Sequence, residues 1–177
     1  MVKNKNIDAF ILAAGLGTRM KHLTKDIPKP LVKVNNKPLI EYSLDNLKKF
    51  GTSNVVINLH YKSKLLKSYL DMKSKFLEKI NIQFSFESDS LLDTGGGIKK
   101  GIKMISSNPF FILNSDTIRV DNEINIMEEM VSQWNPKIMD FLLLLFPVEK
   151  AKHYSGSGDF HINKHNQIYP FLVLNNC

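Results

Sequence analysis

The chain lacks a pair of cysteines for a disulfide bond and a long apolar run for a membrane segment. Its only cysteine is the last residue, Cys177, so no disulfide can form within it. The longest apolar run, Phe141 to Phe146, is far shorter than the roughly 20 residues that cross a bilayer. Two early lysines lead directly into an apolar segment, without the pattern of a cleavable signal. We therefore expect a cytoplasmic protein with no membrane partner.

Arginine is almost absent, which makes its position informative. Of the 24 Lys and Arg residues, only Arg19 and Arg119 are arginine. Arg19 nonetheless lies within a glycine-containing loop. A guanidinium can bind phosphate through two parallel hydrogen bonds, whereas a lysine acts as a point charge. Chance placement is the simpler explanation for one arginine alone, but its neighbours favour a phosphate-binding role.

Catalytic and metal-binding patterns of other kinds are also missing. The histidines show no metal-ligand spacing, and no Ser-His-Asp or Cys-His arrangement is evident. A net charge of +7 is compatible with nucleic-acid binding. The lysines, however, are dispersed along amphipathic segments such as Tyr61–Lys79, with no stripe of basic and aromatic residues. Nucleic-acid binding is therefore a minor alternative.

The remaining pattern alternates strands and helices. Apolar segments predict strands at Ile7–Ala13, Val55–Leu59, Ile82–Phe86, Phe110–Asn114 and Met139–Phe146. Amphipathic segments predict helices at Pro38–Phe50, Tyr61–Lys79, Thr94–Ile105 and Asn122–Gln133. This order predicts an α/β fold, a mostly parallel Rossmann-like sheet flanked by helices. With 177 residues and 43% hydrophobic content, the chain suits one domain with its own core.

A glycine loop follows the first predicted strand. We give this name to residues 12–19, which are Leu12, Ala13, Ala14, Gly15, Leu16, Gly17, Thr18 and Arg19. The two glycines let the backbone approach a bulky anion and direct N–H groups at it, while Thr18 adds a hydroxyl. Lys29, held between two prolines in extended geometry, adds a second fixed positive charge. The loop matches neither the P-loop pattern nor the three-glycine dinucleotide fingerprint.

Two further segments follow predicted strands and should meet the glycine loop at one edge of the sheet. Gly95, Gly96 and Gly97 open a predicted helix that Thr94 would cap, and bare N–H groups at a helix start attract anions. Asp116 ends the Asn114-Ser115-Asp116 run after an apolar strand, where a carboxylate suits a hard cation beside phosphate. A simple turn would explain either segment alone.

These motifs together resemble the sugar-phosphate nucleotidyltransferases, which make nucleotide sugars. The string from Leu12 through Lys29 to Leu31 is the most specific part of the resemblance, which extends from Ala9 to about Phe160. With the upstream Glu87, the triple glycine resembles a segment that borders the nucleobase and ribose in relatives. Glu87 could equally be a solvated loop acid. Gly158-Asp159-Phe160 resembles a motif of the N-acetylmuramate 1-phosphate uridylyltransferases, where the glycine lies near the sugar.

The resemblance implies a reaction and a role for each residue. A sugar 1-phosphate oxygen would attack the α-phosphorus of a nucleoside triphosphate and release pyrophosphate. Arg19 and Lys29 would be catalytic and would hold phosphates, while Asp116 would bind Mg²⁺, the implied cofactor. The nucleotide would contact the glycine loop, Lys29, Gly95 and Gly96; the sugar phosphate would contact Asn114 and Gly158. UTP with N-acetylmuramate 1-phosphate is the first expectation, and GTP with mannose 1-phosphate is the second.

One departure from the family pattern leaves alternatives open. Relatives carry a second metal-binding aspartate in a carboxyl-terminal segment, which this chain lacks. We expect a single nucleotidyltransferase domain over residues 1–177, truncated at its carboxyl-terminal end. A catalytically silent nucleotide-binding or regulatory module is the rival interpretation, and a site completed by another chain is a third.

Overall fold

The computed structural model describes residues 7–73, 77–119, 125–165 and 167–170. Contacts between Cα atoms divide the chain into two compact units, Met1–Gln133 and Trp134–Cys177, which we describe separately. Within the described residues, no helix combines the length and apolar character needed to cross a membrane.

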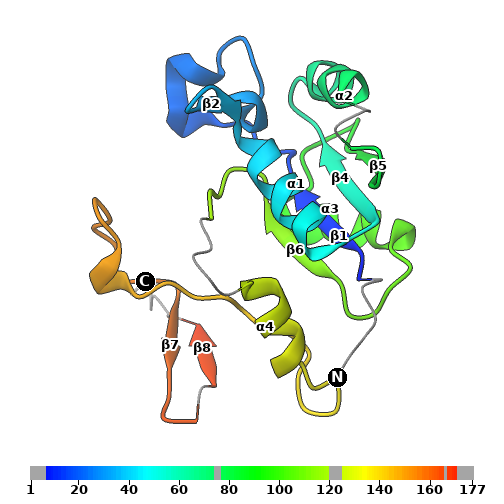
Figure 1. Cartoon of the computed structure of the whole chain (residues 1–177). Helices are drawn as coiled ribbons and strands as arrows, with labels where there is room; N and C mark the ends of the chain where they lie inside the picture. The colour runs from blue at the N-terminus through cyan, green and yellow to red at the C-terminus, as the bar shows by residue number, and fades with distance from the viewer. Residues whose placement is uncertain (1–6, 74–76, 120–124, 166, 171–177) are drawn as a thin grey trace. The chain divides into compact units, whose positions relative to one another are not determined.

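The first unit is built on a four-stranded sheet in the order β5-β4-β1-β6 (Figure 1). Its strands are β1 (Ala9–Leu12), β4 (Asn54–Leu59), β5 (Asn81–Phe86) and β6 (Phe111–Asn114). All three strand pairings are parallel, and Phe10 in β1 lies opposite Val56 on one side and Ile112 on the other. The prediction of a mostly parallel sheet is therefore confirmed.

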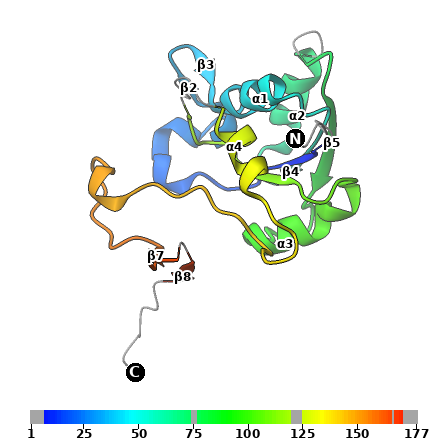
Figure 2. The ribbon, with the colours of Figure 1, turned by 60° about the horizontal axis from the view of Figure 1, so that its bottom comes forward.

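Helices cover both faces of this sheet. Figure 2 shows α1 (Leu39–Phe50) and α2 (Ser63–Met72) on one face and α3 (Asp93–Gly101) on the other. Because side chains alternate along a strand, Ala9 and Ile11 join the core that includes α1 and α2, while Phe10 points to α3. A Cβ at Gly101 would lie 2.5 Å from the Phe10 ring, so glycine there permits the close packing of α3 on β1.

Shorter elements complete the first unit. Asn35 and Asn36 adopt left-handed φ angles of 49° and 61°, which turn β2 (Lys33–Val34) into β3 (Lys37–Pro38). Met127, in α4 (Ile126–Gln133), is buried in the core with α1. The remaining elements are short 3-10 helices: η1 (Thr18–Thr24), η2 (Lys29–Leu31) and η3 (Ile102–Met104).

Four of the five predicted strands and all four predicted helices are present, with some different ends. The helix predicted to reach Lys79 ends at Met72, and residues 74–76 lie outside the described part. The helix predicted from Asn122 is described from Ile126 onward, since residues 120–124 are outside it. Gly51 ends α1 at a left-handed φ of 94°, where its N–H donates to Leu47 and Lys48 carbonyls.

The prediction of a strand at Met139–Phe146 is wrong. This segment has no regular secondary structure, and Phe141 and Phe146 are 76% and 69% exposed. A strand forms where a neighbouring strand supplies hydrogen bonds and a packed layer covers its face, and apolar composition alone specifies neither. The run therefore indicated a preference for burial without determining a partner.

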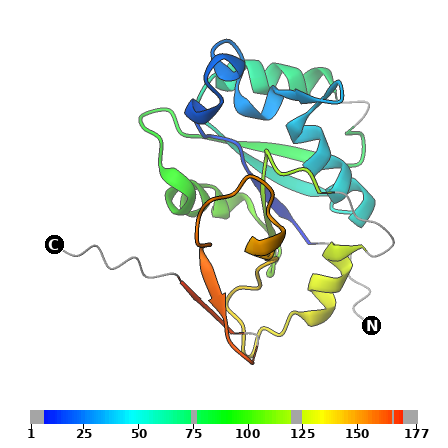
Figure 3. The same ribbon diagram turned by 90° about the vertical axis from the view of Figure 1, so that its left-hand side faces the viewer.

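The second unit contains one hairpin and one short helix in its described residues. Strands β7 (Phe160–Ile162) and β8 (Ile168–Pro170), orange to red in Figure 3, pair in antiparallel fashion. The short 3-10 helix η4 (Val148–Lys150) precedes them. Gly158 lies before β7 with a left-handed φ of 98°, and its N–H donates to the Tyr154 hydroxyl at 3.3 Å. Whether residues 1–177 act as one domain stays a prediction.

Candidate functional site

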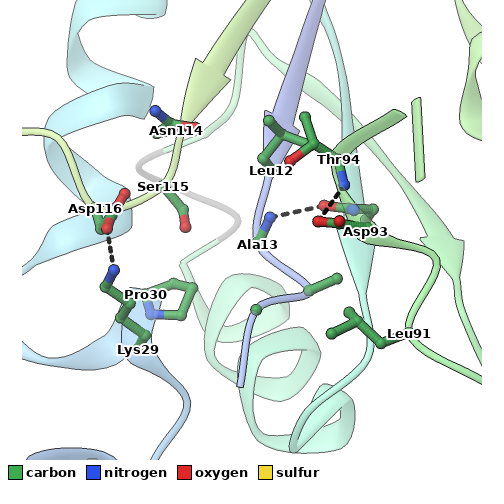
Figure 4. Close-up of a pocket in the computed structure, with 13 residues that line it drawn as sticks. Leu12, Ala13, Lys29, Pro30, Leu91, Asp93, Thr94, Asn114, Ser115 and Asp116 are labelled. Atoms are coloured by element: carbon green, nitrogen blue, oxygen red, sulfur yellow. Dashed lines mark hydrogen bonds and ion pairs between the residues drawn. The ribbon is translucent and has the colours of Figure 1, made fainter. Parts of the chain in front are cut away.

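A pocket of about 180 Å³ lies at the carboxyl-terminal edge of the sheet (Figure 4). In the strand order, β4 lies on one side of β1 and β6 lies on the other, so the order reverses between β1 and β6. The loops that follow these two strands diverge there and leave room for a ligand. Three predicted segments converge on the pocket, as expected from the strand ends. Its lining comprises Leu12, Ala13, Ala14, Gly15, Lys29, Pro30, Asn58, Leu91, Asp93, Thr94, Asn114, Ser115 and Asp116.

The glycine loop divides into a part that lines the pocket and a part that lies outside it. Leu12 through Gly15 line the pocket, and a Cβ at Gly15 would have no atom within 4 Å. Gly17 lies beyond it at a φ of 68°, with its carbonyl accepting a 2.8 Å hydrogen bond from the Thr24 hydroxyl. A Cβ at Gly17 would lie 2.9 Å from Thr24, so this turn requires glycine for both conformation and space.

Thr18 and Arg19 lie at the start of η1, outside the residues that line the pocket. The Arg19 side chain is exposed to solvent. The Tyr61 hydroxyl donates to the Thr24 carbonyl at 3.0 Å and so fastens the far end of η1 to the segment after β4. The phosphate-binding role of Arg19 thus stays a prediction.

Lys29 and Asp116, predicted to handle phosphate and metal, form an ion pair. Pro28 is extended at φ −69° and ψ 148°, but Lys29 itself begins the 3-10 helix η2, so the prediction of an extended Lys29 is wrong. Both Pro28 and Pro30 are buried, which anchors the backbone on each side of Lys29. The Lys29 and Asp116 side chains are 33% and 29% exposed, and both line the pocket. A cation and an anion therefore stand together beside the glycine loop.

The segment that carries Asp116 is held at two points. The Ser115 N–H donates to the Leu12 carbonyl at 3.2 Å, which continues the pairing of β6 with β1. The Ser43 hydroxyl, from α1, donates to the Asn114 carbonyl at 3.1 Å. Asn114 and Asp116 therefore lie in the pocket as predicted, on a backbone fixed by a strand and a helix.

The second glycine cluster, Gly95 to Gly97, lies in the first turns of α3, and its glycines have different surroundings. The helix begins at Asp93, whose carboxylate accepts a 2.9 Å hydrogen bond from the Thr94 N–H, so the predicted cap at Thr94 is wrong. Gly95 and Gly96 do not line the pocket, and a Cβ at Gly95 would meet nothing within 4 Å. A Cβ at Gly97 would lie 2.6 Å from the Glu87 carboxylate.

Glu87 and Asn58 form a buried polar connection that the sequence did not single out. Glu87 is 2% exposed, so the alternative of a solvated loop acid is wrong. The Asn58 side chain donates to a Glu87 oxygen at 2.8 Å and accepts from the Ala13 N–H at 2.7 Å. Asn58 went unnoticed, although a lone amide in the apolar strand Val55–Leu59 is a detectable signal.

Two predictions are not tested by the geometry of this pocket. Gly158 belongs to the second unit, and its predicted contact with sugar stays a prediction. Among the residues that the structure describes, no group of three or more His, Cys, Asp or Glu side chains could hold a metal ion.

Comparison with known proteins agrees with the geometry. Residues 8–168 match the family described as nucleotidyl transferase. The chain belongs to this family. It is 34% identical over 155 residues to an N-acetylmuramate alpha-1-phosphate uridylyltransferase of Caulobacter vibrioides, covering 88% of this chain and 64% of that protein. It is 42% identical over 111 residues to a D-glycero-alpha-D-manno-heptose 1-phosphate guanylyltransferase of Campylobacter jejuni, covering 63% of this chain and 48% of that one.

Solved structures agree on the fold of this chain. HddC from Yersinia pseudotuberculosis, complexed with GMP-PN, is 31% identical with a TM-score of 0.57, covering 71% of this chain and 53% of that one. A UDP-glucose pyrophosphorylase complexed with UDP-glucose is 22% identical with a TM-score of 0.63, covering 72% and 52%. The second likeness shows the fold alone. The chain thus spans between about half and two thirds of these relatives.

Proposed function

We propose that the chain carries the nucleotide site of a Mg²⁺-dependent sugar-1-phosphate nucleotidyltransferase. An oxygen of a sugar 1-phosphate attacks the α-phosphorus of a nucleoside triphosphate and forms a new P–O bond. The bond between the α-phosphorus and the bridging oxygen breaks, and pyrophosphate leaves with the electron pair. No covalent intermediate with the protein is needed, so positioning and charge neutralisation supply the catalysis.

One observation carries this proposal: Lys29 and Asp116 meet as an ion pair beside the glycine loop in a single pocket. Phosphoryl and nucleotidyl transfer need a cation for the phosphate oxygens and a carboxylate for a divalent ion. The loop adds the Ala14 and Gly15 backbone, with Gly15 exposed and open around its Cβ position. The pocket thus brings together the chemical groups that the reaction requires. It does so where the strand order of the sheet reverses, the usual place for a ligand in such sheets.

The residues present are compatible with Mg²⁺. Magnesium binds through one or two carboxylates and completes its shell with substrate phosphates and water. Asp116 offers a partly exposed carboxylate, and Asp93 also lines the pocket. When bound, the ion would neutralise triphosphate charge. Lys29 would exchange its partner Asp116 for phosphate oxygens, and exposed Arg19 would bind the departing pyrophosphate from η1.

The substrate pair that we propose first is UTP with N-acetylmuramate 1-phosphate. The relative named for that uridylyl transfer aligns with 88% of this chain, further than the guanylyltransferase of Campylobacter jejuni does. The alternative pair is GTP with mannose 1-phosphate, because a mannose-1-phosphate guanyltransferase of Hypocrea jecorina is 39% identical over 113 residues. We propose a cytoplasmic location and no nucleic-acid partner, in keeping with the dispersed lysines.

The deciding experiment is pyrophosphate release by the purified 177-residue chain. Each of the four nucleoside triphosphates is supplied with Mg²⁺ and a panel of sugar 1-phosphates, and nucleotide binding is measured in parallel by calorimetry. Release with one matched pair would establish the activity, the base and the sugar together. Binding without release would favour the silent nucleotide-binding module. If the chain neither binds a nucleotide nor releases pyrophosphate, the proposal is refuted.

A further inference from the structure

We infer that Asn58 and Glu87 are positioning residues that hold the two loops of the nucleotide pocket in place. The inference rests on the proposed function, because it concerns how the same pocket is kept ready for nucleotide. Neither residue is assigned a catalytic role: Asn58 borders the pocket, and Glu87 acts through Asn58 and through the backbone of the segment before α3.

The hydrogen bonds run across the carboxyl edge of the sheet from one loop to the other. The Ala13 N–H donates to Asn58 Oδ1 at 2.7 Å, and Asn58 Nδ2 donates to Glu87 Oε1 at 2.8 Å. The other carboxylate oxygen, Glu87 Oε2, accepts from the Leu92 N–H at 2.9 Å. The chain of bonds thus connects the glycine loop to the segment that begins α3, and both segments line the pocket.

The carboxylate determines which way the Asn58 amide points. A carboxylate only accepts hydrogen bonds, so Asn58 must present its NH₂ group to Glu87. Its oxygen is then the atom that faces the Ala13 N–H. Both side chains are 2% exposed, and water cannot readily replace a lost partner at such depth. With the Ala13 N–H committed to Asn58, the loop offers a ligand the later amides of Ala14 and Gly15.

The backbone around Glu87 and the helix above it keep this connection closed. The Glu87 N–H donates to the Leu59 carbonyl at 2.8 Å, and a ring nitrogen of His60 lies 2.7 Å from the Glu87 carbonyl oxygen. A Cβ at Gly97 would lie 2.6 Å from Glu87 Oε1 and 2.7 Å from Asn58 Nδ2. Only glycine at this point of α3 leaves room for the two polar groups.

Each single isosteric substitution either removes one of the three bonds or sets like charges against each other. In Glu87→Gln the new NH₂ group faces either the Leu92 N–H or the Asn58 NH₂, a donor against a donor. If Asn58 rotates to accept it, the Ala13 N–H loses its acceptor instead. In Asn58→Asp, a second carboxylate replaces the NH₂ donor that faces Glu87 in the natural chain. The two carboxylates repel each other, which disfavours having both charged.

The reciprocal double variant Asn58→Asp/Glu87→Gln restores every bond. The carboxylate introduced at position 58 accepts from both the Ala13 N–H and the NH₂ group introduced at position 87. The amide oxygen at position 87 then accepts from the Leu92 N–H. Formal charge is the same as in the natural chain.

A matched control is Asn54→Asp on the same strand, β4. There the Asn54 amide oxygen accepts from the side chains of Asn81 and Gln83, away from the pocket. The substitution changes the same chemical group as Asn58→Asp and leaves both loops of the pocket untouched. It therefore separates an added charge on β4 from the loss of the connection between the loops.

The test measures dissociation constants of Mg²⁺-bound UTP and GTP by calorimetry and free energies of unfolding in urea for all five proteins. We expect each single variant to bind the preferred nucleotide about tenfold more weakly or worse, and the double variant to return to within roughly threefold of the natural chain. Asn54→Asp should bind normally. Single variants that bind normally, whatever their stability, would overturn the inference and leave the proposed function intact.

Two further outcomes are decided by the same set of proteins. If the single variants do not fold, the double variant alone decides: near-natural binding supports the inference, and loss of folding or binding overturns it. If the natural chain binds no nucleotide, the proposed function fails. Hydrogen exchange at the Ala13 and Leu92 amides then tests the positioning role by itself. Protection that is lost in the single variants and recovered in the double variant supports the positioning role; unchanged protection overturns it.

Discussion

The ammonium of Lys29 forms an ion pair with the carboxylate of Asp116, joining the segment after β1 to the segment after β6 (Figure 4). Each side chain therefore satisfies the charge of the other. Both are about one-third exposed, so the pair contributes only ~0–1 kcal/mol to stability. A triphosphate with its metal ion can replace this pair at little cost, which is the behaviour that the proposed reaction needs.

Asp116→Asn tests the metal assignment. Loss of the carboxylate should raise the Mg²⁺ concentration for half-maximal activity or nucleotide binding by about tenfold or more, equal to ~1.4 kcal/mol. A Mg²⁺ titration measures this. The control is Asp45→Asn, which breaks the Lys37–Asp45 ion pair of nearly equal exposure (30% and 28%) outside the pocket. Equal Mg²⁺ dependence in the two variants would contradict the assignment.

Arg19→Ala tests the role of the glycine loop's guanidinium. Because Arg19 is exposed, the free energy of unfolding should change by no more than about 0.5 kcal/mol. Turnover should fall by roughly 100-fold or more if the side chain stabilises the leaving pyrophosphate. Pyrophosphate release is measured beside Lys21→Ala, a charge removal two residues further on, at the kink of η1. Full activity of Arg19→Ala would remove the main argument for the loop.

Gly97→Ala and Gly95→Ala are a matched pair within α3. Helix propensity alone predicts that either alanine stabilises the protein by up to about 1 kcal/mol. The Gly95 position is open, so it should follow that expectation. At Gly97 the new methyl group would press on Glu87 and Asn58, and overpacking should instead destabilise by about 1–3 kcal/mol. Urea unfolding curves distinguish the two, and equal effects would contradict the packing described here.

Glu41 should make stability depend on pH on the acid side. Burial raises the pKa of Glu41, but hydrogen bonds from Tyr69 and Lys73 outweigh it and lower the pKa below the ordinary value of 4.5. The unfolded chain therefore takes up a proton at higher pH than the folded protein does. The stabilisation is complete above pH 4.5 and is lost as the pH falls through the folded-state value.

Glu41→Gln measures this contribution. Its free energy of unfolding should lie below that of the natural chain at about pH 7, and the difference should shrink as the pH falls below 4.5. Urea unfolding at several pH values gives the comparison. Glu78→Gln, which removes the same charge from an exposed position, is the control. A constant difference between Glu41→Gln and the natural chain at all pH values would contradict the sign derived above.

The sequence by itself determined the order of elements and indicated several of the residues that line the pocket. Alternating apolar segments specify parallel strands and covering helices, and short-range signals such as Gly51 mark where a helix ends. In a parallel sheet the loops after several strands meet at one edge. Leu12 through Gly15, Lys29, Asn114 and Asp116 could therefore be assigned to one pocket before their coordinates were known.

Only the tertiary structure decided which polar groups are buried together. Glu87 looks like a loop acid in the sequence, yet it is 2% exposed because β4, β5 and α3 close around it. The failure of the Met139–Phe146 strand has the same origin, since pairing depends on a partner distant in the chain. Local composition reports what each residue prefers, whereas burial and hydrogen-bond partners depend on segments that the sequence does not place side by side.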